Sequence, residues 1–189
     1  MKIKSTLLLF ALIMVSGQLM TGQTTGNGVV DLLLSAYSPR SYTTQAVTDQ
    51  QLDLILKCGI KAPSARNIQP WRFTVVRDEP TMKEIIPNIV EGNVLILVSG
   101  VESKEGGTPD FDCGLAAENM FIAATSLGLG ARIYGGPAGT ANTKREALQV
   151  PMGYKVVVIL RVGNINNSVD AASGASPRKT AEEIVNYKK

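Results

Sequence analysis

The chain of 189 residues contains no histidine. This absence excludes Ser-His-Asp and Cys-His nucleophile systems, zinc sites with histidine ligands and histidine general bases. An enzyme with this composition needs lysine, carboxylate or tyrosine chemistry, or a cofactor that carries the reaction itself.

Cysteine is scarce as well, since Cys58 and Cys113 are the only two. They could form a disulfide if the chain is exported, because disulfides persist in oxidising compartments. Cys58 falls on an apolar helical pattern and Cys113 at the start of another. We therefore expect two small buried residues rather than a bridge.

The start of the chain carries only a short apolar run. Lys2 and Lys4 precede apolar residues from Leu7 to Val15, and small and polar residues follow. A membrane-spanning helix needs about 20 apolar residues, so this run is too short. The layout indicates a secretory signal peptide over residues 1–23, with an uncleaved membrane tether as the alternative. We expect an exported protein, periplasmic in a bacterium, with a single domain over residues 24–189.

Excess positive charge is also missing from the expected mature chain. The net charge is +3, and it falls to +1 once Lys2 and Lys4 are removed. No stripe of lysine and arginine interleaved with aromatic residues is present. We therefore expect no nucleic-acid partner, and we expect no metal ion.

The remaining sequence mixes helical and strand patterns, which predicts an α+β domain. The helix that begins after Thr48 has a capping box with Gln51 and ends before Pro63. The helix over residues 111–127 is apolar on most sides, which places it in the core or at a subunit interface. Other helices are predicted over residues 29–36, 81–89 and 143–148, strands over residues 73–76, 94–98 and 156–160, and a loop over residues 163–176.

Between the capped helix and the next strand lies the segment Ala62–Phe73, APSARNIQPWRF. Proline, serine, arginine, asparagine, glutamine and tryptophan occupy a place where a plain connector would use glycine, aspartate and serine. Turns of this composition are typical of functional sites.

This turn strongly resembles the flavin-contacting turn of the nitroreductase family, a family of FMN-dependent oxidoreductases. Four further segments resemble that family in the same order, over roughly residues 36–185. Tyr37–Tyr42 is similar to the family's phosphate-binding Arg-Arg-Ser-x-Arg segment, and Asp112–Asn119 with the glycine exit Leu127–Gly130 is similar to its central helix. Tyr134–Gly136 falls where the family presents a backbone N–H to the flavin. Pro177–Lys179 is similar to the family's C-terminal phosphate clamp. Ala36 stands at the first arginine of the family pattern, and Arg66 stands where the family commonly has a small residue.

The resemblance implies an α+β fold with a mainly antiparallel central sheet flanked by helices, in an interlocked homodimer that binds FMN at the dimer interface. The residues that it implies for cofactor binding are Ser38, Arg40, Pro63, Ser64, Ala65, Arg66, Asn67, Gly135, Gly136 and Arg178. Ser38, Arg40 and Arg178 would hold the phosphate, and Ser64, Arg66 and Asn67 would bond to the ring edge. The backbone N–H of Gly135 would face flavin N5, and no side chain needs to act as an acid or base.

Several of these residues also have a plainer role open to them. Arg40 could be a surface ion-pair partner, and Asn67 could stabilise its own turn. We expect Gln69 and Trp71 to brace the turn and the core rather than contact the cofactor. Asn119 is expected to make a structural hydrogen bond, because an unpaired buried amide is costly.

The implied reaction is transfer of hydride from a reduced nicotinamide to flavin N5, followed by reduction of a small acceptor such as a nitroaromatic or a quinone. A flavin-binding or electron-carrying protein with low turnover is an alternative, because free NAD(P)H should be scarce outside the cytoplasm. A reductive dehalogenase or a flavin-degrading enzyme on the same scaffold is another.

Overall fold

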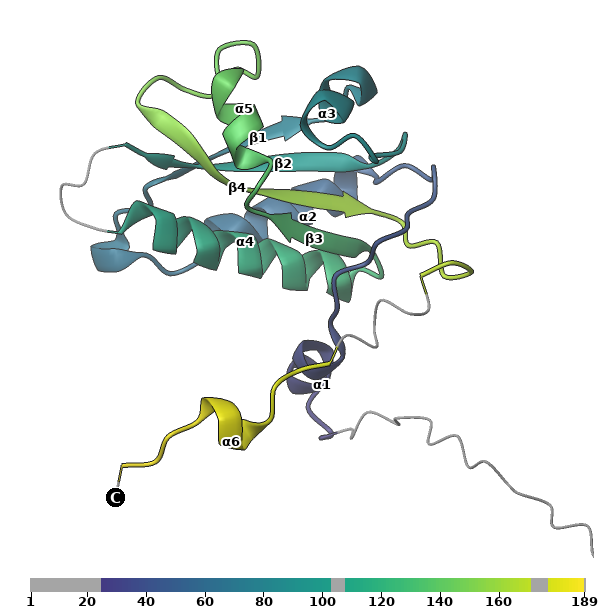
Figure 1. Ribbon diagram of the computed structural model, residues 1–189, viewed down its shortest axis with the longest axis vertical. Helices are drawn as coiled ribbons and strands as arrows, with labels where there is room; N and C mark the ends of the chain where they lie inside the picture. The colour runs from purple at the N-terminus through teal and green to yellow at the C-terminus, as the bar shows by residue number, and fades with distance from the viewer. Residues whose placement is uncertain (1–24, 103–107, 171–176, 189) are drawn as a thin grey trace, which may run out of the picture.

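The computed structural model describes residues 25–102, 108–170 and 177–188 (Figure 1). The predicted signal peptide lies outside the described residues, so the domain boundary at residue 24 stays a prediction. The elements in chain order are α1 Gly28–Ser35, α2 Asp49–Ile60, the short 3-10 helix η1 Ala65–Asn67, β1 Trp71–Val76, α3 Glu79–Ile85, β2 Val94–Val101, α4 Pro109–Ser126, β3 Gly130–Tyr134, α5 Ala138–Thr143, β4 Tyr154–Gly163 and α6 Ala181–Ile184.

The centre of the fold is a four-stranded sheet in the order β1-β2-β4-β3. All three strand pairs are antiparallel, with Trp71 opposite Gly100 at one end of the sheet and Gly130 opposite Gly163 at the other. Every residue of β2 from Val94 to Gly100 is buried, because both faces of the sheet are covered. The predicted α+β class with an antiparallel sheet is confirmed.

Helices cover the sheet in two layers. Figure 1 shows α2 and α4 on one face and α3 and α5 on the other, and each layer has its own hydrophobic core. The first core is built around Ile55 of α2, Met120 of α4 and the inward side chains of β2 and β4. The second core contains Met82 and Ile85 of α3 and the side chains of Leu95 and Ile159 from the opposite sheet face. The central helix α4 is therefore a core element, as its apolar sequence predicts.

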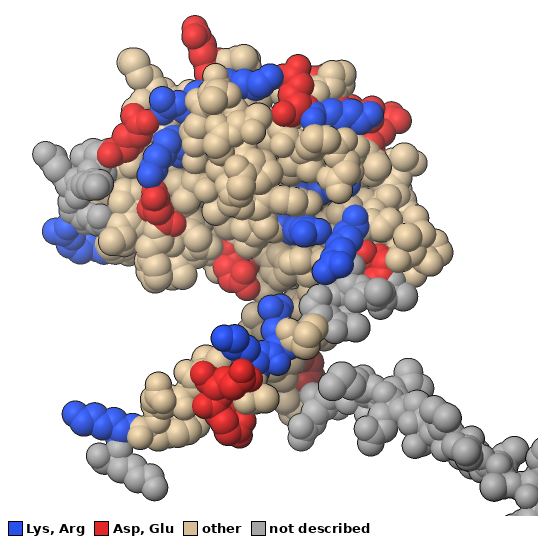
Figure 2. Space-filling model, in the orientation of Figure 1, with Lys and Arg blue, Asp and Glu red and all other residues tan. Residues whose placement is uncertain are grey.

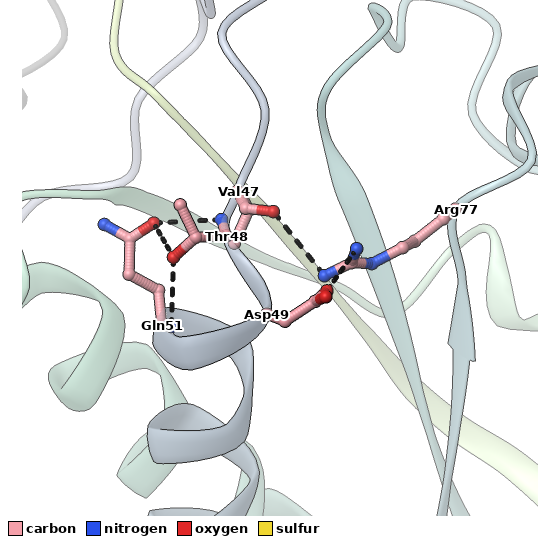
Figure 3. Close-up of polar contacts among 5 residues, drawn as sticks. All are labelled: Val47, Thr48, Asp49, Gln51 and Arg77. Atoms are coloured by element: carbon pink, nitrogen blue, oxygen red, sulfur yellow. Dashed lines mark hydrogen bonds and ion pairs between the residues drawn. The ribbon is translucent and has the colours of Figure 1, made fainter.

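The start of α2 is fixed by the predicted capping box. The Thr48 hydroxyl accepts the N–H of Gln51 at 3.2 Å, and the Gln51 side-chain oxygen accepts the N–H of Thr48 at 3.1 Å (Figure 3). Arg77, just beyond β1, forms an ion pair with Asp49 at 2.7 Å and reaches the carbonyl of Val47 at 3.5 Å. This group joins the first turn of α2 to the end of β1, the two elements that flank the turn of residues 61–70.

Close packing of α2 on α4 requires a glycine at position 59. A Cβ added there would lie 2.7 Å from the Met120 side chain and 3.2 Å from that of Phe73. Helix α2 therefore lies directly on α4, which determines where the segment after α2 meets the first turn of α4.

Several parts of the structure differ from what the sequence predicts. The helix expected over residues 143–148 lies earlier, as α5, because Pro137 starts it and the chain after Thr143 turns towards the left-handed Gln149, with φ 54°. The strand β3 was not predicted, because its five residues begin with Gly130 and read as the glycine exit of α4. The loop predicted from residue 163 begins one residue later, since Gly163 still pairs in β4.

The cysteines are both free, and only one of them is buried. Cys113 lies in the core, whereas Cys58 is exposed on α2, so the expectation of a buried residue was wrong for Cys58. Cys58 lies on the outward side of α2, because Leu52, Ile55 and Gly59 are the buried residues of this helix.

Charged side chains of both signs are interspersed over the face of the molecule seen in Figure 2. Among the described residues, no helix has the length and apolar character required to cross a membrane.

Candidate functional site

The turn after α2 is built on left-handed backbone conformations. Ser64 is extended, with φ −143° and ψ 157°, and the chain then passes through η1 with φ 51° at Arg66 and 56° at Asn67. Gln69 follows with φ 52°. Non-glycine residues rarely adopt this conformation, and each instance costs about 1–2 kcal/mol. Such strain is maintained only where the surroundings hold the chain, which is typical of ligand-binding turns.

Internal hydrogen bonds give the turn its shape. The Ser64 hydroxyl accepts the N–H of Gln69 at 3.0 Å, and the Ser64 carbonyl accepts the N–H of Asn67 at 3.0 Å. The Gln69 amide nitrogen donates to the carbonyl of Asn67 at 3.2 Å, and Trp71 is 5% exposed and stacks on Phe73. Gln69 and Trp71 thus brace the turn and the core in the structure. Ser64 has a structural role that the sequence did not reveal.

The remaining turn residues present polar groups to the surface. Pro63, Ala65, Arg66 and Asn67 are exposed, and Ser64 is half-buried. The side-chain amide of Asn67 makes no hydrogen bond within the described part of the chain. An amide can both donate and accept, which suits the carbonyl and nitrogen edge of a flat heterocycle.

One hydrogen bond ties this turn to the central helix. The N–H of Ala65 donates to Oδ1 of Asp112 at 3.3 Å, and Asp112 is 1% exposed in the first turn of α4. The sequence indicates Asp112 only as part of the segment Asp112–Asn119, without a role of its own.

The segment before α2 is held by a second buried carboxylate. Oδ1 of Asp170 accepts the main-chain N–H groups of Arg40 at 2.7 Å and Ser41 at 3.0 Å. Asp170 is 3% exposed. The same two segments also pair through an isolated β-bridge between Tyr42 and Ile165. The chain around Arg40 is thereby fixed against the segment that follows β4, while the side chains of Ser38 and Arg40 remain exposed.

Ser38 and Arg178 line the same cavity, which has a volume of about 240 Å³. The lining also contains Tyr37, Glu118 of α4 and Ile133 of β3. Arg40 is not among the lining residues, so the structure brings together two of the three residues expected to hold a phosphate. Glu118 was not predicted, and its one signal in the sequence is that it is an acid in the middle of a mainly apolar helix.

The glycine pair lies just beyond β3, two residues after Ile133. Gly135 and Gly136 are exposed, and a Cβ added to either would meet no atom within 4 Å. The space beside this backbone is therefore open to a ligand.

The turn and the cavity lie at different places along α4. The turn contacts Asp112, whereas the cavity contains Glu118 and Phe121, six and nine residues later. Six to nine residues of α-helix span about 9–14 Å. In one copy of the chain, the two sets of predicted residues therefore lie at different positions along α4.

Two tyrosines of the segment Tyr37–Tyr42, of which Tyr37 lines the cavity, are kept protonated. Burial, together with the neighbouring Asp170, raises the pKa of Tyr37. Burial also raises the pKa of Tyr42, whose ring lies 4.1 Å from the guanidinium of buried Arg161. Both hydroxyls thus stay neutral at physiological pH, and neither is set up as a general base.

Asn119 of α4 makes the expected structural bond, donating to the carbonyl of Cys58 at 3.2 Å. No group of three or more Cys, Asp or Glu side chains able to hold a metal ion occurs in residues 25–102, 108–170 and 177–188.

Known proteins share sequence patterns and the fold with this chain. The family profile described as "Nitroreductase family" matches residues 33–99 and 91–164. A protein of Archaeoglobus fulgidus, described as an NADH dehydrogenase/NAD(P)H nitroreductase, is 32% identical to this chain over 143 residues. The match covers 70% of this chain and 82% of that protein. The NADPH-flavin oxidoreductase of Vibrio harveyi is 25% identical over 179 residues, which cover 84% of this chain and 73% of that protein. A crystal structure from Desulfovibrio desulfuricans in complex with FMN has a TM-score of 0.72 and 31% identity, covering 86% of this chain and 98% of that chain.

Proposed function

Because this chain belongs to the nitroreductase family, we propose that it is an oxidoreductase that binds FMN and takes reducing equivalents from NADH or NADPH. The FMN complex of the 31% identical structure and the NADPH-flavin oxidoreductase of Vibrio harveyi support both parts of this proposal. The observation on this chain that carries it is the cavity where Ser38 and Arg178 meet.

That cavity suits the phosphate of FMN. A phosphate monoester carries nearly two negative charges, and arginine offers a planar fork of donors that matches its oxygens. Arg178 and the Ser38 hydroxyl supply such donors from the lining. Arg40, two residues after Ser38 on a fixed main chain, is an exposed cation that can approach the same phosphate.

The exposed groups of the turn suit the polar edge of the flavin ring. The free amide of Asn67 can donate and accept, and Arg66 and the half-buried Ser64 lie beside it. At Gly135 the open space beside the backbone lets its N–H approach a ring nitrogen.

Bound FMN supplies the redox chemistry, in which hydride from a reduced nicotinamide reaches N5 and reducing equivalents pass to a small acceptor such as a nitroaromatic or a quinone. The chain contributes the position of the cofactor and the electrostatics around it. Side chains that titrate are not required for this role, in agreement with the neutral hydroxyl of Tyr37 in the cavity lining.

We further propose that two copies of the chain complete each site. The positions of the turn and of the cavity at different points along α4 support this proposal, because a turn from one copy can meet the phosphate cavity of another. Exposed apolar side chains on α1 support it as well; Val29 and Leu34 are 65% and 70% exposed. An apolar groove of about 690 Å³ between α1, α2 and α4 lies beside them.

The shared site is tested by complementation between two inactive variants. Arg178→Ala removes the cavity cation, and Asn67→Ala removes the turn amide. In a mixed dimer, one site has both defects and the other has neither. Random pairing of equal amounts makes about half of the dimers mixed, so co-refolded variants should recover about a quarter of the wild-type FMN sites. Recovery no greater than the sum of the separate variants would contradict a site shared between copies.

Export of the protein is a separate proposal, supported by the pattern of residues 1–23. Mass spectrometry of protein from the producing cells should find a mature N-terminus near residue 24, in the fraction outside the cytoplasm. A chain that retains Met1 or the apolar run would contradict cleavage.

The flavin assignment is tested by titrating the purified protein with FMN and riboflavin and following the quenching of flavin fluorescence. FMN should bind more tightly, because only FMN carries the phosphate that Ser38 and Arg178 face. Absence of FMN binding would overturn the proposed function.

A further inference from the structure

Asp112 is a buried carboxylate that contacts the turn between α2 and β1. It lies in the first turn of α4 with 1% of its surface exposed, and its Oδ1 accepts the N–H of Ala65 at 3.3 Å. Its Oδ2 is buried and accepts no hydrogen bond from the described residues. Burial of a charged group is unfavourable, so a carboxylate at this position needs an explanation beyond packing.

The start of α4 reduces the cost of this charge. Free N–H groups at a helix N-terminus stabilise a negative charge within the first turn. Asp110, two residues earlier, has a different environment, since it is exposed and forms an ion pair with Lys155 at 3.0 Å. The two acids share one helical turn, and only Asp112 reaches the segment after α2.

The segment that Asp112 holds is strained. Ala65, whose N–H it accepts, directly precedes Arg66 and Asn67, with φ 51° and 56°. The N–H groups of Asn67, Ile68 and Gln69 bond within the turn, to Ser64 and Ala65. The bond from Ala65 instead joins the turn to the rigid central helix, which makes Asp112 the anchor for this end of the turn.

We propose that Asp112 is a positioning residue, whose carboxylate holds the Ala65 N–H and so keeps Ser64, Arg66 and Asn67 in the conformation that receives the flavin ring. This inference rests on the proposed function, and it adds a residue that acts through the turn without touching the cofactor. It predicts a loss that depends on the ring of the ligand and not on its phosphate.

The first experiment compares three variants by their affinity for FMN and riboflavin. Asp112→Ala should weaken both ligands by a similar factor of about tenfold, which corresponds to about 1.4 kcal/mol. Asp112→Asn retains an oxygen that can accept the Ala65 N–H, so it should stay within about threefold of wild type. Asp110→Ala is the matched control from the same helical turn and should leave both affinities unchanged.

The second experiment removes the donor instead of the acceptor. Ala65→Pro deletes the N–H, and proline is well suited to the first position of a short helix after an extended Ser64. If Asp112 acts through this N–H, Ala65→Pro should weaken both ligands as Asp112→Ala does. The double variant should then be little weaker than either single variant, since both changes break one interaction.

Hydrogen exchange of the ligand-free protein gives a readout that does not depend on flavin binding. Asp112→Ala should speed amide exchange in residues 64–69 and leave exchange in β2 and in the middle of α4 unchanged. Slowed or unchanged exchange in the turn, additive losses in the double variant, or a loss confined to FMN would each overturn the inference. If wild-type protein binds no flavin, the proposed function fails, while the exchange experiment still decides whether Asp112 holds the turn.

Discussion

Oδ1 of Asp170 accepts the main-chain N–H of Arg40 at 2.7 Å, across 130 positions of sequence. It also accepts the N–H of Ser41, so two hydrogen bonds fix the backbone while the Arg40 side chain stays exposed. Asp112 makes a similar bond to Ala65 in the turn. Two of the segments expected to bind flavin are thus each held by a buried aspartate from a distant part of the chain.

Because its backbone is held by Asp170, Arg40 can be truncated without disturbing the main chain. Arg40→Ala should weaken FMN binding by about 10- to 150-fold, the equivalent of a charge-assisted hydrogen bond worth about 1.5–3 kcal/mol. Riboflavin, which lacks the phosphate, should bind nearly as before. Fluorescence titration of both ligands measures the difference, and equal losses for the two would refute a phosphate role for Arg40.

Glu118 shares the lining of the phosphate cavity with Arg178. Glu118→Gln removes a like charge near the phosphate, so FMN should bind about 1.5- to 5-fold more tightly, in the range of a partly screened surface interaction. Riboflavin affinity should not change, and the effect should shrink as salt is added. Glu84→Gln, at an exposed ion pair with Lys144 on the other face of the sheet, is the control. Weaker FMN binding in Glu118→Gln would show that this carboxylate supports the site.

The two cysteines should react differently with thiol reagents. Burial raises the pKa of Cys113 to about 12, and the nearby Asp110 and Asp112 add to the effect. At a pH of about 8 the reactive thiolate is therefore absent at Cys113, whereas Cys58 is exposed. The native protein should release about one equivalent of chromophore from a disulfide reagent and the denatured protein about two. Cys58→Ser should abolish the native signal, and fast labelling of that variant would contradict the buried position of Cys113.

The capping box of α2 is open to a direct stability test. Thr48→Ala removes the hydroxyl that accepts the Gln51 N–H, so it should lower the free energy of unfolding by about 1 kcal/mol and the Tm by about 2–4 °C. Thr44→Ala is the matched control, since Thr44 is exposed and its hydroxyl makes no hydrogen bond with the described residues. Equal melting temperatures for wild type and Thr48→Ala would show that the cap contributes nothing measurable.

Local patterns predicted the elements whose signals lie within a few residues. The capping box at Thr48, the apolar run from Val94 and the apolar helix α4 all appear in the structure at about their expected places. The strand β3 was missed because its pairing with β4 is a long-range contact. A five-residue strand that begins with a glycine also shows little periodicity in the sequence.

The site could be predicted as a list of residues but not as an arrangement. The resemblance predicts that Ser38 and Arg178 bind the same phosphate, and both residues line one cavity in the structure. Local patterns could not show that Asp170 and Asp112 hold the two segments, because those bonds join residues that are 130 and 47 positions apart. The same holds for Glu118, which enters the cavity only through the packing of α1 and β3 around α4.

The central claim is that this chain is an FMN-dependent oxidoreductase supplied by a reduced nicotinamide. The most direct test mixes FMN-loaded protein with NADH or NADPH in the absence of oxygen and follows the visible absorbance of the flavin. One of the two nicotinamides should bleach the flavin rapidly, and a nitroaromatic or a quinone added afterwards should restore the colour over many cycles. A flavin that binds tightly but stays oxidised with both nicotinamides would contradict the claim and indicate an electron carrier instead.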